Sequence, residues 1–300
     1  MATLKDLRNR ISSVKSTQKI TSAMKMVAAA KLRKAQMSAE AARPFSGRMG
    51  RMVSTLAGSA GEGAGGSPLL AGTGQDDKHL IVVVSSDRGL CGGFNANVSR
   101  EVRGRVHALR ESGKTVRLLF VGRKAKDSLA RDFRDLIDDT LEGLLKTGAQ
   151  YADASDLGTR LLSMYENGDF DVCTMVYTEF QSAMTQTVKG QQILPVPIEL
   201  GADDDGEGSP AATESGAIYE YEPSEEDILN DLLPRNLNVQ LFKAFLESYA
   251  SEQGARMTAM DNATRNAGDM IDGLTLTYNR TRQANITREL IEIISGAEAL

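Results

Sequence analysis

Two long helix-compatible segments at opposite ends of the chain constrain its fold most. One covers residues 1–58 and the other residues 236–300, and the sequence between them has a different character. A long amphipathic helix buries its apolar stripe only against a partner. The two segments lie too far apart in sequence to form a local hairpin. We therefore expect the chain to close on itself, with both ends paired in one antiparallel coiled coil.

The N-terminal segment opens with apolar residues at spacings of three, four and three, the pattern of a heptad seam. They are Leu4, Leu7, Ile11 and Val14. The stripe weakens across residues 16–19 and resumes on a rotated face. That face carries Ile20, Met24 and Val27. Each of these side chains fits simple core packing. The polar and small residues around them are more typical of a surface that slides against several partners.

The C-terminal segment carries a second stripe whose members mostly lie three or four residues apart. They are Leu246, Met260, Ala263, Ala267, Ile271, Leu274 and Tyr278. The last dozen residues are largely apolar. A chain end normally frays into water, so an apolar end predicts that a partner encloses it.

Residues 59–235 alternate between short apolar runs and amphipathic ones, which predicts a βαβ domain. Strands are expected at 79–84, 116–121, 171–180 and 191–198, and helices at 95–112, 125–131 and 151–167. Pro195 and Pro197 place the last strand at an edge. Segments 58–77 and 201–215 are expected to be loops of variable length. The fold class is therefore α/β: a Rossmann-like, mostly parallel sheet attached to a long coiled coil.

Charge is distributed unevenly along the chain. Residues 1–35 hold nine Lys or Arg and one acid, whereas residues 199–231 hold twelve acids and no Lys or Arg. The basic end suits an acidic protein partner. It lacks the interleaved aromatics of a nucleic-acid surface, so no nucleic acid is expected.

The two cysteines, Cys91 and Cys173, form no disulfide framework and fit a reducing compartment. The start of the chain has no signal-peptide pattern, and no apolar run reaches the ~18 residues that span a bilayer. We expect a soluble or peripheral protein.

Two glycine-containing segments resemble nucleotide-binding loops without matching them. Gly113-Lys114-Thr115 would need a glycine at position 108, where Ala108 stands, and a strand before it rather than after it. The run 89–93 follows a strand but lacks the dinucleotide fingerprint. His79 and His107 are isolated, and with two separate cysteines they make no metal set. The sequence therefore predicts no catalytic, cofactor-binding or metal-binding residue.

Several stretches, taken in order, closely resemble the gamma subunits of bacterial F-type ATP synthases. They are LKDLRNRI at 4–11, TQKIT at 17–21, AMKMVAA at 23–29, SSDRGLCG at 85–92, SEQGARMTAM at 251–260 and YNRTRQANITREL at 278–290. The resemblance spans the chain, and its terminal motifs are the most specific. It implies a rotor shaft without an active site. The two helices would turn inside a ring of three alpha and three beta subunits, and the α/β domain would form a foot.

The resemblance also implies roles for individual residues. Met24 and Lys25 would face the lever segment of beta, and the shaft residues that grip beta loops would be Arg256, Gln283, Thr287 and Glu289. Without the resemblance, a solvated helix surface would be the simpler interpretation of these four. The C-terminal residues of the upper bearing would be Ile293, Ile294, Ala297 and Leu300. The foot contact with epsilon or the c ring would be Tyr219, Tyr221 and Glu222.

The resemblance further implies the setting of the protein. One copy would join three alpha and three beta subunits, an epsilon subunit and the c ring, at the cytoplasmic face of the bacterial inner membrane. It would bind no cofactor itself, because ATP, ADP and Mg²⁺ bind to the alpha and beta subunits. Two alternatives remain open from the residues alone. One is a soluble α/β enzyme dimerised by its helical ends, with a pocket near 89–93, and the other is an unrelated coiled-coil adaptor.

Overall fold

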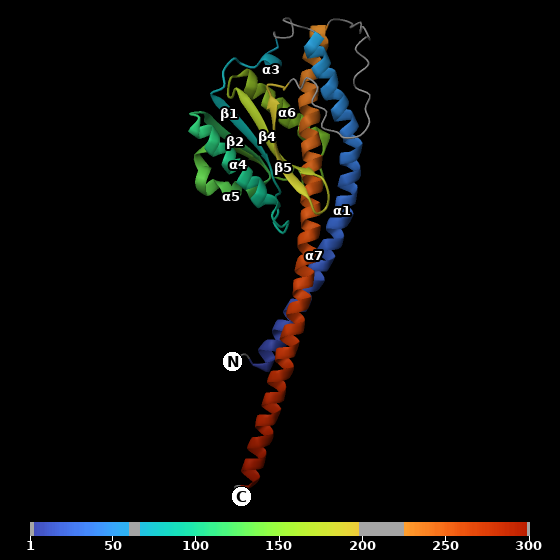
Figure 1. Cartoon of the computed structure of the whole chain (residues 1–300), viewed down its shortest axis with the longest axis vertical. Helices are drawn as coiled ribbons and strands as arrows, with labels where there is room; N and C mark the ends of the chain where they lie inside the picture. The colour runs from blue at the N-terminus through green and yellow to red at the C-terminus, as the bar shows by residue number, and fades with distance from the viewer. Residues whose placement is uncertain (1–2, 60–66, 198–224, 299–300) are drawn as a thin grey trace.

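A long helix pair with an α/β domain on one flank makes up the protein (Figure 1). The computed structural model describes residues 3–59, 67–197 and 225–298. Helix α1 covers Leu4–Ser59 and helix α7 covers Glu225–Glu298. The two run antiparallel, because contacts that move up α1 move down α7. The contacting pairs are Arg8 with Tyr278, Lys25 with Asp261, and Arg43 with Glu247.

The face of α1 that packs on α7 follows one unbroken heptad pattern of buried and half-buried side chains. In its first half the positions are 4, 7, 11, 14, 18, 21, 25 and 28, and in its second half 32, 35, 39, 42, 46, 49, 53 and 56. On α7 the pattern continues through 260, 264, 267, 271, 274 and 278. A strict heptad imposes a left-handed supercoil. The predicted coiled coil is confirmed, and its seam continues through polar Gln18, Thr21 and Lys25.

Helix α7 joins two segments that the sequence pattern separates. Ser224 with the acids at 225–227 predicts a helix start there, and the second rod is expected from about 236. The structure has one helix that begins at Glu225 and contains Pro234. A proline inside a helix removes one backbone hydrogen bond. Here Leu229, Leu233 and Leu237, all on one face, are buried against the α/β domain. This packing offsets the local cost of the proline.

Five strands form the sheet in the order β3-β2-β1-β4-β5. Their bounds are β1 Lys78–Val84, β2 Thr115–Val121, β3 Ile137–Leu141, β4 Val172–Phe180 and β5 Gln186–Leu194. The first four are parallel, and β5 pairs antiparallel to β4 at the edge. The mostly parallel sheet is confirmed. The edge strand lies earlier than 191–198 because it ends before Pro195, whose nitrogen has no hydrogen to donate.

Helices cover both faces of the sheet (Figure 1). On one face, α4 (Phe94–Glu111) and α5 (Arg123–Phe133) cover inward side chains such as Ile81 and Val83. On the other, α6 (Tyr151–Glu166) and α7 cover alternate side chains such as Leu80 and Val82. Two short helices, α3 (Pro68–Ala71) and η1 (Arg134–Leu136), complete the domain. Its core therefore includes the upper part of α7, which makes the domain and the helix pair one packed unit.

Candidate functional site

The rotated face of α1 lies beside the seam and borders a hollow of about 480 Å³. Ile20, Met24, Val27 and Lys31 recur at spacings of four, three and four and line it from α1. Ile20 and Val27 are 60% and 57% exposed. The other walls are α7 and the loop that joins β1 to α4. The rotated apolar face predicted from the sequence is therefore confirmed, and it faces the α/β domain and solvent rather than the seam.

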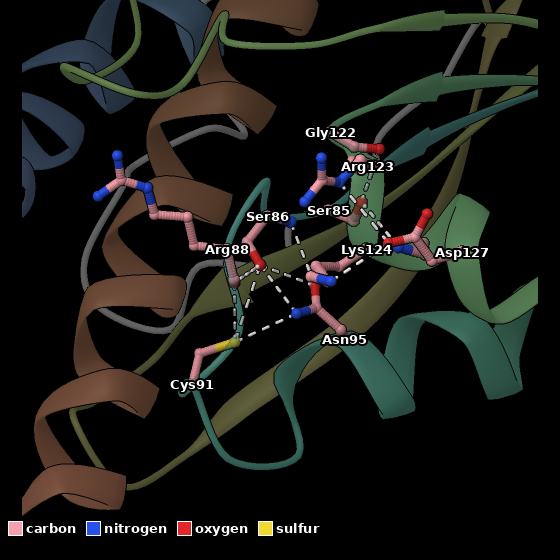
Figure 2. Close-up of polar contacts among 10 residues, drawn as sticks. Ser85, Ser86, Arg88, Cys91, Asn95, Gly122, Arg123, Lys124 and Asp127 are labelled. Carbon is pink, nitrogen blue, oxygen red and sulfur yellow. Dashed lines mark hydrogen bonds and ion pairs between the residues drawn. The ribbon is translucent and has the colours of Figure 1, made fainter.

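Side-chain hydrogen bonds hold the loop between β1 and α4 in its turn (Figure 2). Asn95 Nδ2 donates to Ser86 Oγ at 2.8 Å and to Cys91 Sγ at 3.2 Å. Ser86 Oγ donates to the carbonyl of Arg88 at 2.6 Å. Leu90, at φ 64°, carries its side chain outward and is 62% exposed. The glycine-rich run thus forms a rigid, self-bonded turn that presents Arg88 and Leu90 at the hollow.

Arg256 joins α7 to this loop. Its Nη1 lies 2.6 Å from Glu252 Oε1, and its Nη2 donates to the carbonyl of Gly89 at 3.3 Å. The Arg256 and Glu252 side chains are only 13% and 10% exposed. Burial raises the pKa of Glu252, and Arg256 acts in the opposite direction. In this chain Arg256 bonds the loop between β1 and α4. Contact of this region with a loop of another subunit would therefore be made by the surface that Arg256 holds in place.

Charged and apolar side chains together line the hollow, with more cations than acids. The cations are Lys31, Arg88, Lys146 and Arg256, and the acids are Asp87 and Glu252. The apolar lining includes Met24, which is half-buried. Such an arrangement suits the acidic and partly apolar surface of another protein, because cations attract it from a distance and apolar contact desolvates it. Lys31, Lys146 and Glu252 were not predicted as site residues. Lys31 could have been predicted from helical spacing, because the rotated face continues to position 31.

Lys25 lies in the seam rather than on the rotated face. Its Nζ lies 2.6 Å from Asp261 Oδ1, and the two side chains are 44% and 27% exposed. One turn away, Thr264 Oγ1 donates to Thr21 Oγ1 at 2.8 Å. These polar contacts make the middle of the seam different from an apolar zipper. The structure therefore separates Met24 from Lys25: Met24 borders the hollow, and Lys25 is paired inside the helix pair.

The C-terminal part of α7 extends beyond the N-terminal end of α1 (Figure 1). Gln283, Thr287 and Glu289 are exposed there and have no hydrogen bond or ion pair with the rest of the described chain. Ile293 and Ile294 are 68% and 57% exposed, and Ala297 is exposed too. Leu300 and the group Tyr219, Tyr221 and Glu222 lie outside the described residues.

The described residues contain no group of three or more His, Cys, Asp or Glu side chains placed to hold a metal. Within the same residues, no helix combines the length and apolarity needed to cross a membrane. Cys91 and Cys173 are both free thiols and both buried. The lining of the hollow combines charge and apolar area, the chemistry of a protein-docking surface.

Comparison with known proteins gives consistent matches. A family model described as ATP synthase matches residues 3–300. ATP synthase gamma chains from Rhodospirillum rubrum and Gluconacetobacter diazotrophicus are 58% and 57% identical to this chain over 302 and 300 residues, and each match covers 100% of both chains.

Solved structures have the same fold. A chain of the central stalk and c-ring structure of the Tetrahymena thermophila mitochondrial ATP synthase is 26% identical, with a TM-score of 0.59 over 81% of this chain and 99% of that one. A chain of the Euglena gracilis mitochondrial ATP synthase gives a TM-score of 0.67 at 21% identity, covering 99% of this chain and 94% of that one.

Proposed function

This chain belongs to the ATP synthase gamma-chain family, and on that premise we propose that it is the central rotor shaft of an F-type ATP synthase. It couples rotation of a membrane ring to ATP synthesis or hydrolysis at sites on other subunits. The alternatives, a soluble α/β enzyme and an unrelated coiled-coil adaptor, are not favoured, since full-length relatives carry the gamma-chain name.

The main support for the proposal comes from the C-terminal part of α7, which extends beyond α1. A cluster of apolar side chains there is about half or more exposed in the chain alone. It comprises Ile286, Leu290, Ile291, Ile293 and Ile294, which are 49%, 53%, 58%, 68% and 57% exposed. Exposed apolar area of this kind marks a surface that another protein covers. A ring of subunits that encloses this end on all sides would bury the cluster while leaving the shaft free to turn.

The shape of the helix pair supports a mechanism that needs no chemistry on this chain. Each catalytic subunit has alternative conformations, and a surface can favour one of them only by binding it better. The hollow, with its cations and apolar lining, lies on one side of the helix pair. As the shaft turns, this side faces each catalytic subunit in succession and favours the same conformation in whichever subunit it faces, so each subunit changes conformation as this side passes. Met24 borders the hollow, which supports its role at the lever segment of beta.

The proposal includes specific partners and a location. A single copy contacts three alpha and three beta subunits, an epsilon subunit and the c ring, at the cytoplasmic face of the bacterial inner membrane. The chain binds no cofactor, and ATP, ADP and Mg²⁺ bind to the alpha and beta subunits. The nine Lys or Arg among residues 1–35 support contact with an acidic neighbour.

Native mass spectrometry of the complex captured through a tag on the native chain tests this function. We expect one copy of this chain with three alpha and three beta subunits, ATPase activity in the complex and none in the chain alone. A homodimer of this chain that binds nucleotide by itself would overturn the proposal in favour of the enzyme alternative.

A further inference from the structure

The C-terminal half of β4 extends past its neighbour β1. On that side β1 pairs with β4 only over Val172–Val176, whereas on the other side β5 pairs with β4 as far as Phe180. Beyond Val176 no strand of the described residues lies beside this edge of β4. Buried backbone N–H and C=O groups need partners. The backbone N–H and C=O groups of residues 177–180 on the β1 side must therefore find partners other than β1.

Helix α7 supplies the first pair of missing bonds, through two serines. The backbone N–H of Thr178 donates to Ser248 Oγ at 3.1 Å. Ser251 Oγ donates to the carbonyl of Thr178 at 3.2 Å. The residues Thr178, Ser248 and Ser251 are all buried, at 2%, 1% and 0% exposure. Both backbone groups of one strand residue are thus satisfied from a helix.

An ion pair between the two long helices supplies the second pair of bonds, two residues further along β4. The backbone N–H of Phe180 donates to Glu247 Oε2 at 3.0 Å, and Arg43 Nη2 donates to the carbonyl of Phe180 at 3.0 Å. Arg43 Nε also lies 2.8 Å from Glu247 Oε1. The Glu247 side chain is 2% exposed. Bonds on alternate residues of one edge reproduce the ladder that a neighbouring strand would make.

These contacts differ in kind from the apolar packing around them. Apolar packing of α7 on the sheet resists separation, but it is not directional. Hydrogen bonds have a preferred geometry, and those to charged groups are roughly twice as strong as neutral ones. Sliding or twisting of α7 against β4 would stretch the three bonds from Ser248, Ser251 and Glu247 together. Arg43 carries the same constraint to α1, so one point joins α1, α7 and the sheet.

We propose that this strand-replacing joint, made by Arg43, Glu247, Ser248 and Ser251 on Thr178 and Phe180, transmits turning force between the α/β domain and the helix pair. Glu247 is its central positioning residue, because it alone bonds both β4 and α1. The inference rests on the proposed function and adds to it the place where torque crosses from one part of the chain to the other.

Torsional stiffness in the assembled complex tests the joint. The ring of three alpha and three beta subunits is fixed to a surface, and a rod is attached through Ser128→Cys on α5, an exposed position in the α/β domain. The native thiols are buried and leave this cysteine as the reactive one. The angular variance of the rod during pauses between ATP-driven steps varies inversely with the stiffness of the path from ring to rod.

Arg43→Ala should raise the angular variance about twofold, because it removes charge-assisted bonds that are the stronger part of the joint. Arg43→Lys should give a smaller rise, and Glu247→Gln likewise, because its amide oxygen can still accept from Phe180. Exchanging the two charges by R43E with E247R should not restore stiffness, since an arginine at position 247 cannot accept that hydrogen bond.

Arg110→Ala is the matched control. Arg110 pairs with Asp135 inside the α/β domain at 3.2 Å, and its side chain is 44% exposed, against 46% for Arg43. Its loss should leave the variance unchanged. Variance equal to wild type in Arg43→Ala and Glu247→Gln would overturn the joint. If these residues only stabilise the fold, the urea midpoint of the variants should fall while the angular variance stays at the wild-type value. This result would overturn the joint too. A wild-type complex in which the rod never rotates with ATP would instead overturn the proposed function on which the joint rests.

Discussion

The ammonium of Lys25 and the carboxylate of Asp261 lie 2.6 Å apart, across the seam of two helices whose sequences are separated by the whole α/β domain. Arg265 bonds the same carboxylate. The hydrogen bond from Lys25 comes first among the causes that hold the pKa of Asp261 below its ordinary value, followed by that from Arg265. The middle of the coiled coil therefore includes an ion pair in place of an apolar layer.

Lys25→Ala should raise the pKa of Asp261 toward its ordinary value. A depressed carboxyl pKa contributes stability above the unfolded-state pKa and loses it as pH falls through the folded-state pKa. The variant should therefore be slightly less stable than wild type near pH 7 and should match it below the folded-state pKa of Asp261. The difference should be small because the pair is partly exposed. Carbon-detected NMR titration of Asp261 checks the pKa, and Lys15→Ala, at an exposed position on the same helix, is the control. An unmoved Asp261 titration would contradict the pairing.

Met24→Lys should weaken the coupling of ATP hydrolysis to proton pumping. The new ammonium would enter a hollow that Lys31, Arg88 and Lys146 already line, and it would change the contact with the facing subunit. The protons pumped per ATP, measured in inverted vesicles, should fall, whereas the volume-conserving Met24→Leu should behave as wild type. Normal pumping by Met24→Lys would remove Met24 from the contact surface.

Replacing both Ile293 and Ile294 by serine should leave the isolated chain as stable as wild type, because both side chains are more than half exposed there. In the complex, each loses a burial contribution of about 1.5–3 kcal/mol at most. The affinity of the chain for the ring should fall on the order of tenfold or more. Surface plasmon resonance against immobilised alpha and beta subunits measures it, with the exposed Ser295→Ala as control. Equal affinities would mean that no bearing encloses this end.

Asp171 should make the α/β domain sensitive to acid. Although burial acts to raise its pKa, hydrogen bonds from Lys78 N, Asp77 N and Thr73 Oγ1 at 2.9–3.0 Å hold it below the ordinary value. This stability is present above the unfolded-state pKa, ~3.9, and lost as pH falls through the folded-state pKa.

The variant Asp171→Ala leaves those donors unpartnered and should cost about 1–3 kcal/mol at pH 7. Its urea midpoint should also depend less on pH between about 5 and 2. The exposed Asp156→Ala is the control. A parallel pH dependence in Asp171→Ala and wild type would contradict the assignment.

Both cysteines should be unreactive in the folded chain. Burial raises the pKa of the Cys173 thiol well above its ordinary value and also raises that of Cys91. The thiolate is the reactive form, so a chromogenic disulfide reagent should titrate no thiol until urea is added, and then both. Cys91→Ser with Cys173→Ser should still assemble, at a cost of about 1–3 kcal/mol for a hydroxyl at position 173 in an apolar site. Loss of assembly would give the thiols a role that this structure does not.

Local pattern was sufficient to predict the rotated face of α1, because helical spacing places Met24 and Val27 on one side whatever packs there. It was insufficient for the polar seam. Gln18, Thr21 and Lys25 interrupt the apolar signal. Partners on α7 explain Thr21 and Lys25, which bond to Thr264 and Asp261. The identity of those partners depends on how the whole chain folds back on itself.

Strand β3 was missed for a similar reason. Two of its five residues are Asp138 and Asp139, which strands disfavour. They are stabilised by Arg117 on β2 and Arg160 on α6, cations that the sheet topology brings close. The strand-replacing joint is another such case, since nothing in the sequence around Thr178 indicates that β1 stops short. Family resemblance gave the roles of Gln283, Thr287 and Glu289, which remain predictions.

The pairing of the first helix with the last has a consequence for biosynthesis. The partner of α1 is α7, which is synthesised only after the strands of the α/β domain, because it begins at Glu225. At about 5–20 residues per second, α1 waits on the order of 10–50 s before Glu298 at the end of its partner is made. Throughout that time Leu32 and Val53, buried in the finished protein, lack the packing that α7 provides. The nascent chain must therefore be protected from aggregation by a chaperone or by early docking of α1 on the α/β domain.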